Sequence, residues 1–400
     1  MSVREPYRGP ALFSGGFRPF FLAATLFGLA AIPVWRSVWR GSAGIGGPFL
    51  PLDWHVHEMV FGYGAAVVAG FLFTAVPNWT GRMPARGRPL MLLLALWMAG
   101  RGAVAGLGAL APMTVLAIDQ SFLLAVVLMM AREIVAGRNW RNLRVLVPVS
   151  LFWLANVAFH LEAAAEGSAG HGRRAGLALL VVLILLIGGR IIPSFTRNWL
   201  AQRGGARLPV PPGRFDAASV VLGAVALAGW VAAPSHPLTA LPAAAAAGLH
   251  LVRLARWRGI ATLRAPLLAM LHLAYLMVPA GFAAVAAAAA GLAEAASPAH
   301  LFGIGAVGGM TVAVMMRATL GHTGRPLVAG PVLSAAFALV LAAALVRVAG
   351  TALVVGPLDG IDLSAALWTC GFALLCWRIA PWLTRAKPGR RQPSPVPPRA

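Results

Sequence analysis

The sequence predicts an all-α membrane protein of about twelve transmembrane helices. Hydrophobic residues make up 59% of the 400 residues and charged residues only 11%, so most segments prefer hydrocarbon to water. The apolar runs are about 20 residues long, the length that crosses a bilayer as a helix, and they lack the period-two alternation of strands. A helix also satisfies every backbone N–H and C=O internally where water is absent.

Twelve such runs follow one another along the chain, and Pro-, Gly- and Arg-rich segments separate them. These segments combine turn residues with charges that stay in the membrane interface. We expect one polytopic domain over 1–386 and a disordered, basic, proline-rich cytoplasmic tail over 387–400. The predicted spans are 18–37, 55–77, 89–109, 112–131, 144–165, 175–195, 216–233, 238–255, 265–290, 299–320, 330–350 and 362–384.

The positions of the basic residues account for the formal net charge of +22. Arginines concentrate in the N-terminal segment, in every second loop and in the C-terminal segment. This positive-inside pattern predicts an even number of crossings with both termini in the cytoplasm, in an inner membrane. It also removes the need for nucleic-acid binding as an explanation of the charge. The basic residues predicted to lie outside are Arg36, Arg40, Arg173, Arg174 and Arg347.

Histidines in the outer half of the membrane form the first candidate site. A ligand-competent side chain in hydrocarbon is costly without partners, so it indicates function. His55 and His57 open the second span just after Asp53, a predicted N-cap, and His160 and His300 lie on the same side. We expect these four imidazoles to approach one another within one ligand-sized cavity. If the helix start is regular, however, positions i and i+2 point about 200° apart and His55 and His57 serve different partners.

A second polar region is predicted toward the cytoplasmic side. His272 lies about 12 Å from the inner end of the ninth span, and His322 ends the tenth span at the cytoplasmic face. His322 therefore cannot share one metal ion with His300, which begins that span. We expect it in a cationic pocket suited to haem propionates or to an anionic substrate; the alternative is ordinary inside-loop charge at a helix exit. The arginines of this pocket are Arg190, Arg317 and Arg325.

The remaining polar residues carry weaker signals. His250 is interpreted as snorkelling beside Arg253 at the inner end of the eighth span. The sequence shows no clear carboxylate deep in the bilayer, since Asp119 and Glu133 are placed at span ends, and this disfavours a proton pump. No C-x-x-C-H string occurs, so a covalently attached c-type haem is excluded.

Several long strings resemble the NnrS family of bacterial membrane proteins. They are "FSGGFRPFFLAATLFG", "DWHVHEMVFGYGAAVVAGFLFTAVPNWTGR", "GGRIIPSFTRNW", "LLAMLHLAYLMVPAG" and "AHLFGIGAVGGMTVAVMMRATLGHTGRPL". The resemblance covers the chain from about Phe13 to Pro326. It implies a twelve-helix protein with haem and copper, linked to nitric oxide, denitrification or nitrosative stress, without an established reaction. The motif residues are His55, His57, His272, His300 and His322, with Arg18, Arg82, Arg190, Arg317 and Arg325; His160 belongs to a weaker match.

The residues themselves are compatible with these cofactors. Non-covalent haem b needs axial imidazoles from facing helices, and small residues such as Gly62 and Gly305 let a flat macrocycle enter between helices. Helix packing without a cofactor is the alternative for these glycines. Imidazole also suits copper. The expected metal ligands are His55, His57, His160, His272 and His300, and the expected cofactor-binding residues are Arg190, Arg317, His322, Arg325, Gly62 and Gly305.

Three classes of function remain open. The favoured one is a haem- and copper-binding membrane protein of the nitric oxide response, which binds or turns over the gas or protects metal centres. The second is a secondary transporter with a path lined by His and Arg, and the third is a sensor or assembly factor. The expected partner is nitric oxide or another small molecule. Any catalysis would be a redox reaction on nitric oxide, for which no catalytic residue is predicted; the sequence does not determine the oligomeric state.

Overall fold

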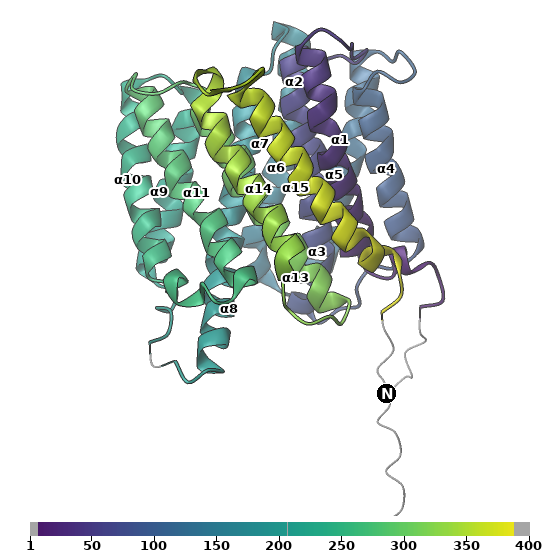
Figure 1. Cartoon of the computed structure of the whole chain (residues 1–400). Coiled ribbons are helices and arrows are strands. Elements are labelled where there is room, and N and C mark those ends of the chain that lie inside the picture. The colour runs from purple at the N-terminus through teal and green to yellow at the C-terminus, as the bar shows by residue number, and fades with distance from the viewer. Residues whose placement is uncertain (1–6, 206, 388–400) are drawn as a thin grey trace, which may run out of the picture.

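The computed structural model describes residues 7–205 and 207–387, which form one bundle of long helices (Figure 1). Within these ranges, eleven helices are long and apolar enough to cross a membrane. A twelfth long helix, α4 (Arg88–Val104), has 17 residues. The predicted polytopic all-α fold is therefore confirmed. The predicted cytoplasmic tail lies, from residue 388 onward, outside the described residues.

The twelve long helices agree with the twelve predicted spans. They are α1 (Phe17–Trp39), α2 (Pro51–His57) continued by α3 (Ala65–Thr80), α4, α5 (Pro112–Ala136), α6 (Leu143–Glu166), α7 (Gly170–Leu183) continued by α8 (Gly189–Ala201), α9 (Arg214–Ala232), α10 (Pro237–Ala255), α11 (Pro266–Ala289), α12 (Ser297–His300) continued by α13 (Gly309–His322), α14 (Gly330–Ala349) and α15 (Gly360–Thr384). A short hairpin of β1 (Val354–Val355) and β2 (Leu358–Asp359) connects the last two.

Proline and glycine set many of the helix ends. Pro112 and Pro266 stand in the first turns of α5 and α11, where a missing N–H costs no hydrogen bond. Gly81 and Gly167 follow α3 and α6 with φ of 69° and 77°, the left-handed conformation that glycine adopts without strain. The separator segments identified in the sequence are therefore real helix boundaries.

The second span begins earlier than the sequence indicated. Its first helix, α2, starts at Pro51, and Leu50 is its N-cap. The predicted N-cap role of Asp53 is therefore wrong, because Asp53 lies within the first turn. Its Oδ1 instead accepts a hydrogen bond from the backbone N–H of Ala169 at 3.3 Å. This earlier start places His55 and His57 inside a regular helical turn.

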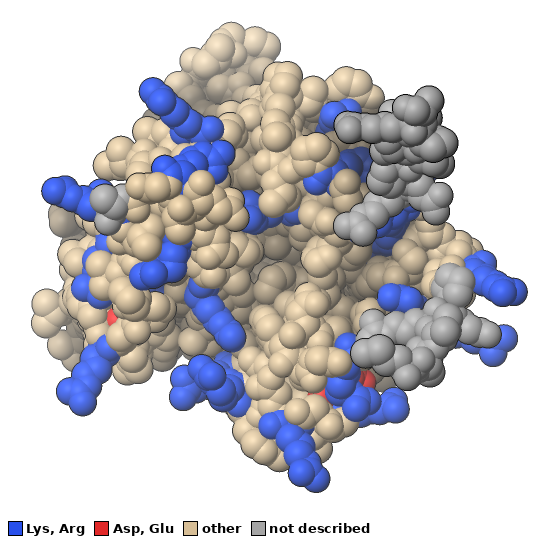
Figure 2. Space-filling view, turned by 90° about the horizontal axis from the view of Figure 1, so that it is seen from below, with Lys and Arg blue, Asp and Glu red and all other residues tan. Residues whose placement is uncertain are grey.

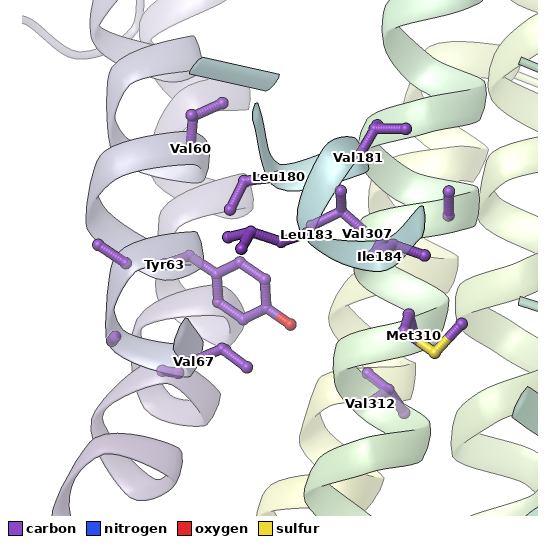
Figure 3. Packing of buried hydrophobic residues seen from close by; sticks show 14 of the residues in the cluster. Val60, Tyr63, Val67, Leu180, Val181, Leu183, Ile184, Val307, Met310 and Val312 are labelled. Atoms are coloured by element: carbon purple, nitrogen blue, oxygen red, sulfur yellow. The ribbon is translucent and has the colours of Figure 1, made fainter. Parts of the chain in front are cut away.

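Three spans contain a stretch of π-helix, and they are the second, sixth and tenth. The stretches are η2 (Glu58–Gly64), η4 (Ile184–Gly188) and η6 (Leu301–Gly308). Side chains of these spans, among them Tyr63, Leu180 and Val307, pack together at the centre of the bundle (Figure 3). Because π-helical turns are rare and frequent at functional sites, the centre of the bundle is the place to look for function.

Both ends of the described chain lie on one side of the bundle. The helix α1 begins, and α15 ends, on the lower side in Figure 1. Seen from below, this face carries many Lys and Arg side chains and very few Asp or Glu (Figure 2). It is therefore the face that the positive-inside pattern predicts to be cytoplasmic, and the hairpin β1–β2 lies on the opposite, outer side.

We expect a topology reporter to distinguish these two faces. A phosphatase that is active only outside the cytoplasm should be active when inserted after Gly356, at the tip of the hairpin, and inactive after Gly204, between α8 and α9. Both glycines are exposed, so an insertion there leaves the packing of the helices intact. Equal activity at both sites, or the reverse pattern, would contradict this orientation.

Candidate functional site

A cavity of about 520 Å³ lies in the outer half of the bundle, between the second, sixth and tenth spans and helices α1, α14 and α15. Its volume falls within the usual range of small-molecule sites. The apolar part of its lining includes Tyr63, Leu180, Val307 and Trp368. The polar part consists mainly of imidazoles and guanidinium groups. We call it the outer cavity.

Four of the five predicted outer arginines line the outer cavity: Arg36, Arg173, Arg174 and Arg347. Arg36 is paired with Asp362. Arg173 lies 3.3 Å from Asp53, Nε to Oδ1, and Arg174 donates to the Val231 carbonyl at 3.1 Å. The Arg347 guanidinium makes no hydrogen bond or ion pair with another described residue, and its backbone carbonyl accepts from the N–H of Gly350. The few basic residues that depart from the positive-inside pattern therefore converge on one cationic rim.

Two of the predicted histidines, His55 and His300, line the same cavity. The His55 ring stacks on Trp35, with ring centroids 4.5 Å apart and planes inclined by 10°. His300 Nδ1 donates to the Ala296 carbonyl at 2.8 Å, which fixes the tautomer in which Nε2 carries the free lone pair. The cavity thus combines two imidazoles with an apolar wall and a cationic rim.

His57 points away from the outer cavity and toward α5 and α6. Its Nε2 lies 3.3 Å from Asp119 Oδ2, and His160 Nε2 lies 3.2 Å from the same oxygen. The ligand atoms of these three residues all lie within 4.8 Å of one another. The predicted single cavity with four histidines is therefore wrong. In a regular helix, residues two apart point about 200° from each other, so His55 and His57 join different sites, as the alternative reading of the sequence required.

Buried charges surround His57. Arg101 of α4 forms ion pairs with both Glu58 and Asp119, and all three side chains are buried. The sequence analysis placed Asp119 at a span end, and it did not show that Asp119 and Glu58 are buried among other helices. We call His57, Glu58, Arg101, Asp119, Asn156 and His160 the charged cluster. A sequence signal for it did exist, since Arg101 and Asp119 are isolated charges inside the apolar runs 89–109 and 112–131.

The sequence profile of a protein family described as "NnrS protein" matches residues 11–387, nearly the whole chain. The chain belongs to the NnrS family. This membership confirms the resemblance found in the motifs and supports a membrane protein of the nitric oxide response. Among curated proteins, no sequence match is found.

The residues predicted to form an inner cofactor site in this NnrS-family chain, Arg190, Arg317, His322 and Arg325, do not pack around a common contact. His300 and His322 lie at opposite ends of the tenth span, as predicted. Each of the predicted inner side chains lies on a different aromatic ring, and none of them lines the outer cavity. Cation–π contacts of this kind hold guanidinium groups at an interface, and cofactor binding by these residues stays a prediction. The pairs are Arg190 on Trp79 at 5.7 Å, Arg317 on Phe195 at 4.1 Å, Arg325 on Trp382 at 4.9 Å and His322 on Phe17 at 5.3 Å.

The two predicted cofactor glycines of the NnrS-family chain accommodate protein side chains. A Cβ at Gly62 would approach Arg101 Nη1 to 2.7 Å, and one at Gly305 would approach Met277 Cγ to 2.8 Å. Close approach of this kind favours the helix-packing alternative at both glycines. Gly62 also accepts a hydrogen bond from Trp97 Nε1 at 3.0 Å. Its lack of a side chain makes room for Arg101 of the charged cluster.

His272 is separate from all the outer histidines. Its Nε2 lies 2.9 Å from Thr196 Oγ1. Its Nδ1 is buried and has no partner among the described residues. His272 is thus buried in the interior of the protein, and the structure does not bring it to another of the predicted metal ligands.

A second buried network lies in the half of the NnrS-family chain that sequence reasoning left without function. Arg253 is buried, and its Nε donates to Asp216 Oδ1 at 3.0 Å. Its Nη1 donates to the Tyr275 hydroxyl at 2.9 Å, and His250 Nδ1 also lies 2.9 Å from that hydroxyl. The snorkelling interpretation of His250 is therefore wrong, because its side chain is fully buried. We call these residues the α9–α11 network. Through buried side chains it joins three helices, and its members are Asp216, His250, Arg253 and Tyr275.

Proposed function

We propose that this NnrS-family protein binds a b-type haem in the outer cavity and acts in the response to nitric oxide at the bacterial inner membrane. The observation that carries the proposal is the convergence of His55, His300 and four arginines on one cavity with apolar walls. A haem group needs these three features: an axial imidazole, an apolar slot for the macrocycle and cations for the propionates.

The residues of the cavity fit such a group. His55 and His300 come from the second and tenth spans, and either can supply an axial nitrogen. Tyr63 and Trp368 supply aromatic walls. Arg347 has no partner among the described residues, so its guanidinium is available to a carboxylate in the bidentate geometry that such pairs adopt. When bound, the iron would supply a coordination site for a small gas such as nitric oxide.

The surroundings of the two imidazoles prepare them for this role. The hydrogen bond from His300 Nδ1 to the Ala296 carbonyl orients the ring, as outer partners of ligating histidines commonly do. The stacking of His55 on Trp35 restricts its rotation. Copper is the second cofactor that we propose, since imidazole nitrogens suit it, and His57 and His160 are the outer imidazoles that do not line the cavity.

The haem proposal predicts that the content of bound haem depends on the cavity histidines. Purified wild-type protein should show a Soret band, and His300→Ala or His55→Ala should lose most of it because an axial ligand is removed. His171→Ala is the matched control, since the His171 side chain is 63% exposed, pairs with Glu162 and does not line the cavity. A wild-type protein without haem, or cavity variants with an unchanged Soret band, would contradict the proposal.

The cationic rim also favours a second candidate function, a transporter of a small anionic metabolite or metal complex. Its binding site would be the same cavity, with Arg347 as the free cation. The two candidates differ in cofactor content. Protein without a Soret band and without copper, whose Arg347→Ala variant loses uptake of an anion, would indicate transport.

A further inference from the structure

A second, smaller pocket lies at the centre of the bundle, between the second, sixth and tenth spans and on the cytoplasmic side of the outer cavity. Its volume is about 80 Å³, and we call it the central pocket. Each of the three π-helical stretches contributes to its wall, through Gly64, Ile184 and Val307. Leu180 and Val307 line both the central pocket and the outer cavity. The two spaces are therefore separated by a common wall of side chains.

The lining of the central pocket offers no free polar group to a ligand. Thr311 carries the only polar side chain among the described residues that line it. Its hydroxyl donates to the Val307 carbonyl at 2.7 Å and accepts from the Tyr63 hydroxyl at 2.6 Å. A buried water molecule needs two to four polar partners, and apolar cavities without them stay dry. The central pocket therefore disfavours water, ions and polar molecules and suits an apolar occupant.

The size of the central pocket limits that occupant further. Sites for cofactors and metabolites commonly have volumes of about 300 to 1,000 Å³, so a pocket of about 80 Å³ is too small for them. Dry apolar cavities in proteins do bind xenon and similar small molecules. The central pocket has room for one such atom or for one diatomic gas molecule.

The burial of the lining shows where such a molecule enters. Gly64 and Leu180, at the outer end of the pocket, are buried. Phe71, Ile191 and Val314 lie toward the cytoplasmic ends of the same three spans and are only half-buried. The central pocket therefore opens toward the inner half of the membrane. An apolar gas dissolves better in hydrocarbon than in water, so the membrane itself supplies it to this entrance.

A hydrogen bond crosses the boundary between the two spaces. Tyr63 lines the outer cavity and Thr311 lines the central pocket, and their hydroxyl groups join the second span to the tenth. Figure 3 shows the Tyr63 ring between these spans, close to Leu180 and Val307. We propose that the central pocket binds one molecule of a small apolar gas and passes it to the outer cavity past Leu180 and Val307. Only the identification of the gas as nitric oxide rests on the proposed function.

Xenon is the probe that tests the binding site without haem. Crystals of the full-length protein held under xenon pressure should show one xenon atom in the central pocket, located by its anomalous scattering. Val314→Phe should lose this atom, because a larger side chain at a half-buried lining position fills the pocket. Val225→Phe is the matched control, since Val225 of α9 is 53% exposed and lines neither space. If Val314→Phe does not fold, Val68→Phe fills the pocket from the second span.

The xenon measurement has three outcomes that overturn the site: no xenon atom in the wild type, an ordered lipid chain in its place, or full occupancy in the filled variant. The passage is tested separately, by the rate at which nitric oxide binds to the haem. Val314→Phe should slow this rate by about tenfold, equal to about 1.4 kcal/mol on the barrier, with an unchanged Soret band. An unchanged rate overturns the passage. A missing Soret band with xenon still bound contradicts the haem proposal and leaves the gas site intact.

Discussion

Replacing Arg101 by Met is expected to lower the free energy of unfolding by about 3 to 5 kcal/mol, the usual cost of leaving a buried charge without its partner. Arg101 is the one guanidinium that pairs with both Glu58 and Asp119 in the charged cluster. Methionine retains much of the apolar volume of the arginine side chain. The loss of stability therefore reports on the missing charge and hydrogen bonds and not on lost packing. Thermal unfolding of the purified protein in detergent measures the effect.

The matched control for this prediction is Arg82→Met. Arg82 also pairs with a glutamate, Glu133, but its side chain is 39% exposed, and pairs at such sites contribute about 1 kcal/mol or less. Adding Glu58→Gln and Asp119→Asn to Arg101→Met should recover much of the stability, because no buried charge is then left unpaired. An Arg101→Met protein that unfolds at the wild-type temperature would show that the cluster is not held together by this guanidinium.

Replacing Asp216 by Asn is expected to destabilise the opposite half of the bundle by a similar amount, about 3 to 5 kcal/mol. Asp216 of α9 is the ion-pair partner of the buried Arg253 of α10. Arg253 in turn donates to Tyr275 of α11 and to the Leu185 carbonyl. Without the carboxylate, the guanidinium stays buried without a counter-ion, and the contact of three helices weakens. The unfolding temperature of the variant checks this expectation.

Arg256→Ala is the control in this half of the chain. Arg256 also approaches Asp216, but at 3.9 Å and with a side chain that is 32% exposed, so its removal should change stability by about 1 kcal/mol or less. The double variant Asp216→Leu with Arg253→Met replaces both charges with apolar groups. It should be more stable than either single variant, because replacing both partners of a buried pair is often neutral. Additive losses in the double variant would contradict a coupled pair.

The large features of this protein follow from the sequence alone. Twelve predicted spans agree with the twelve long helices of the described chain, because hydrocarbon solvent demands apolar runs of a set length. The positive-inside pattern predicted both termini on one side of the membrane. The face seen from below in Figure 2 carries the expected basic residues. The motif strings predicted the NnrS family, which the match over residues 11–387 confirms.

The candidate sites were predicted only in part. The sequence identified His55, His57, His160 and His300 as outer residues, and it stated that His55 and His57 separate if their helix is regular. It did not show that α2 begins at Pro51, which makes the helix regular at that point. The single four-histidine cavity failed for this reason, and two sites took its place.

Hydropathy and charge can be followed along the chain itself. The sequence alone therefore determined which segments cross the membrane and on which side each loop is predicted to lie, and its motif strings determined the family. Which groups meet inside the bundle depends on helix rotation and packing, and only the tertiary structure decided that. In the sequence, Arg101 and Asp119 are isolated charges inside two apolar runs, and Arg253 looks like an inside-loop cation. Each becomes a buried partner because another helix brings an opposite charge to it, and such a pairing compensates the cost that a lone charge would have in hydrocarbon.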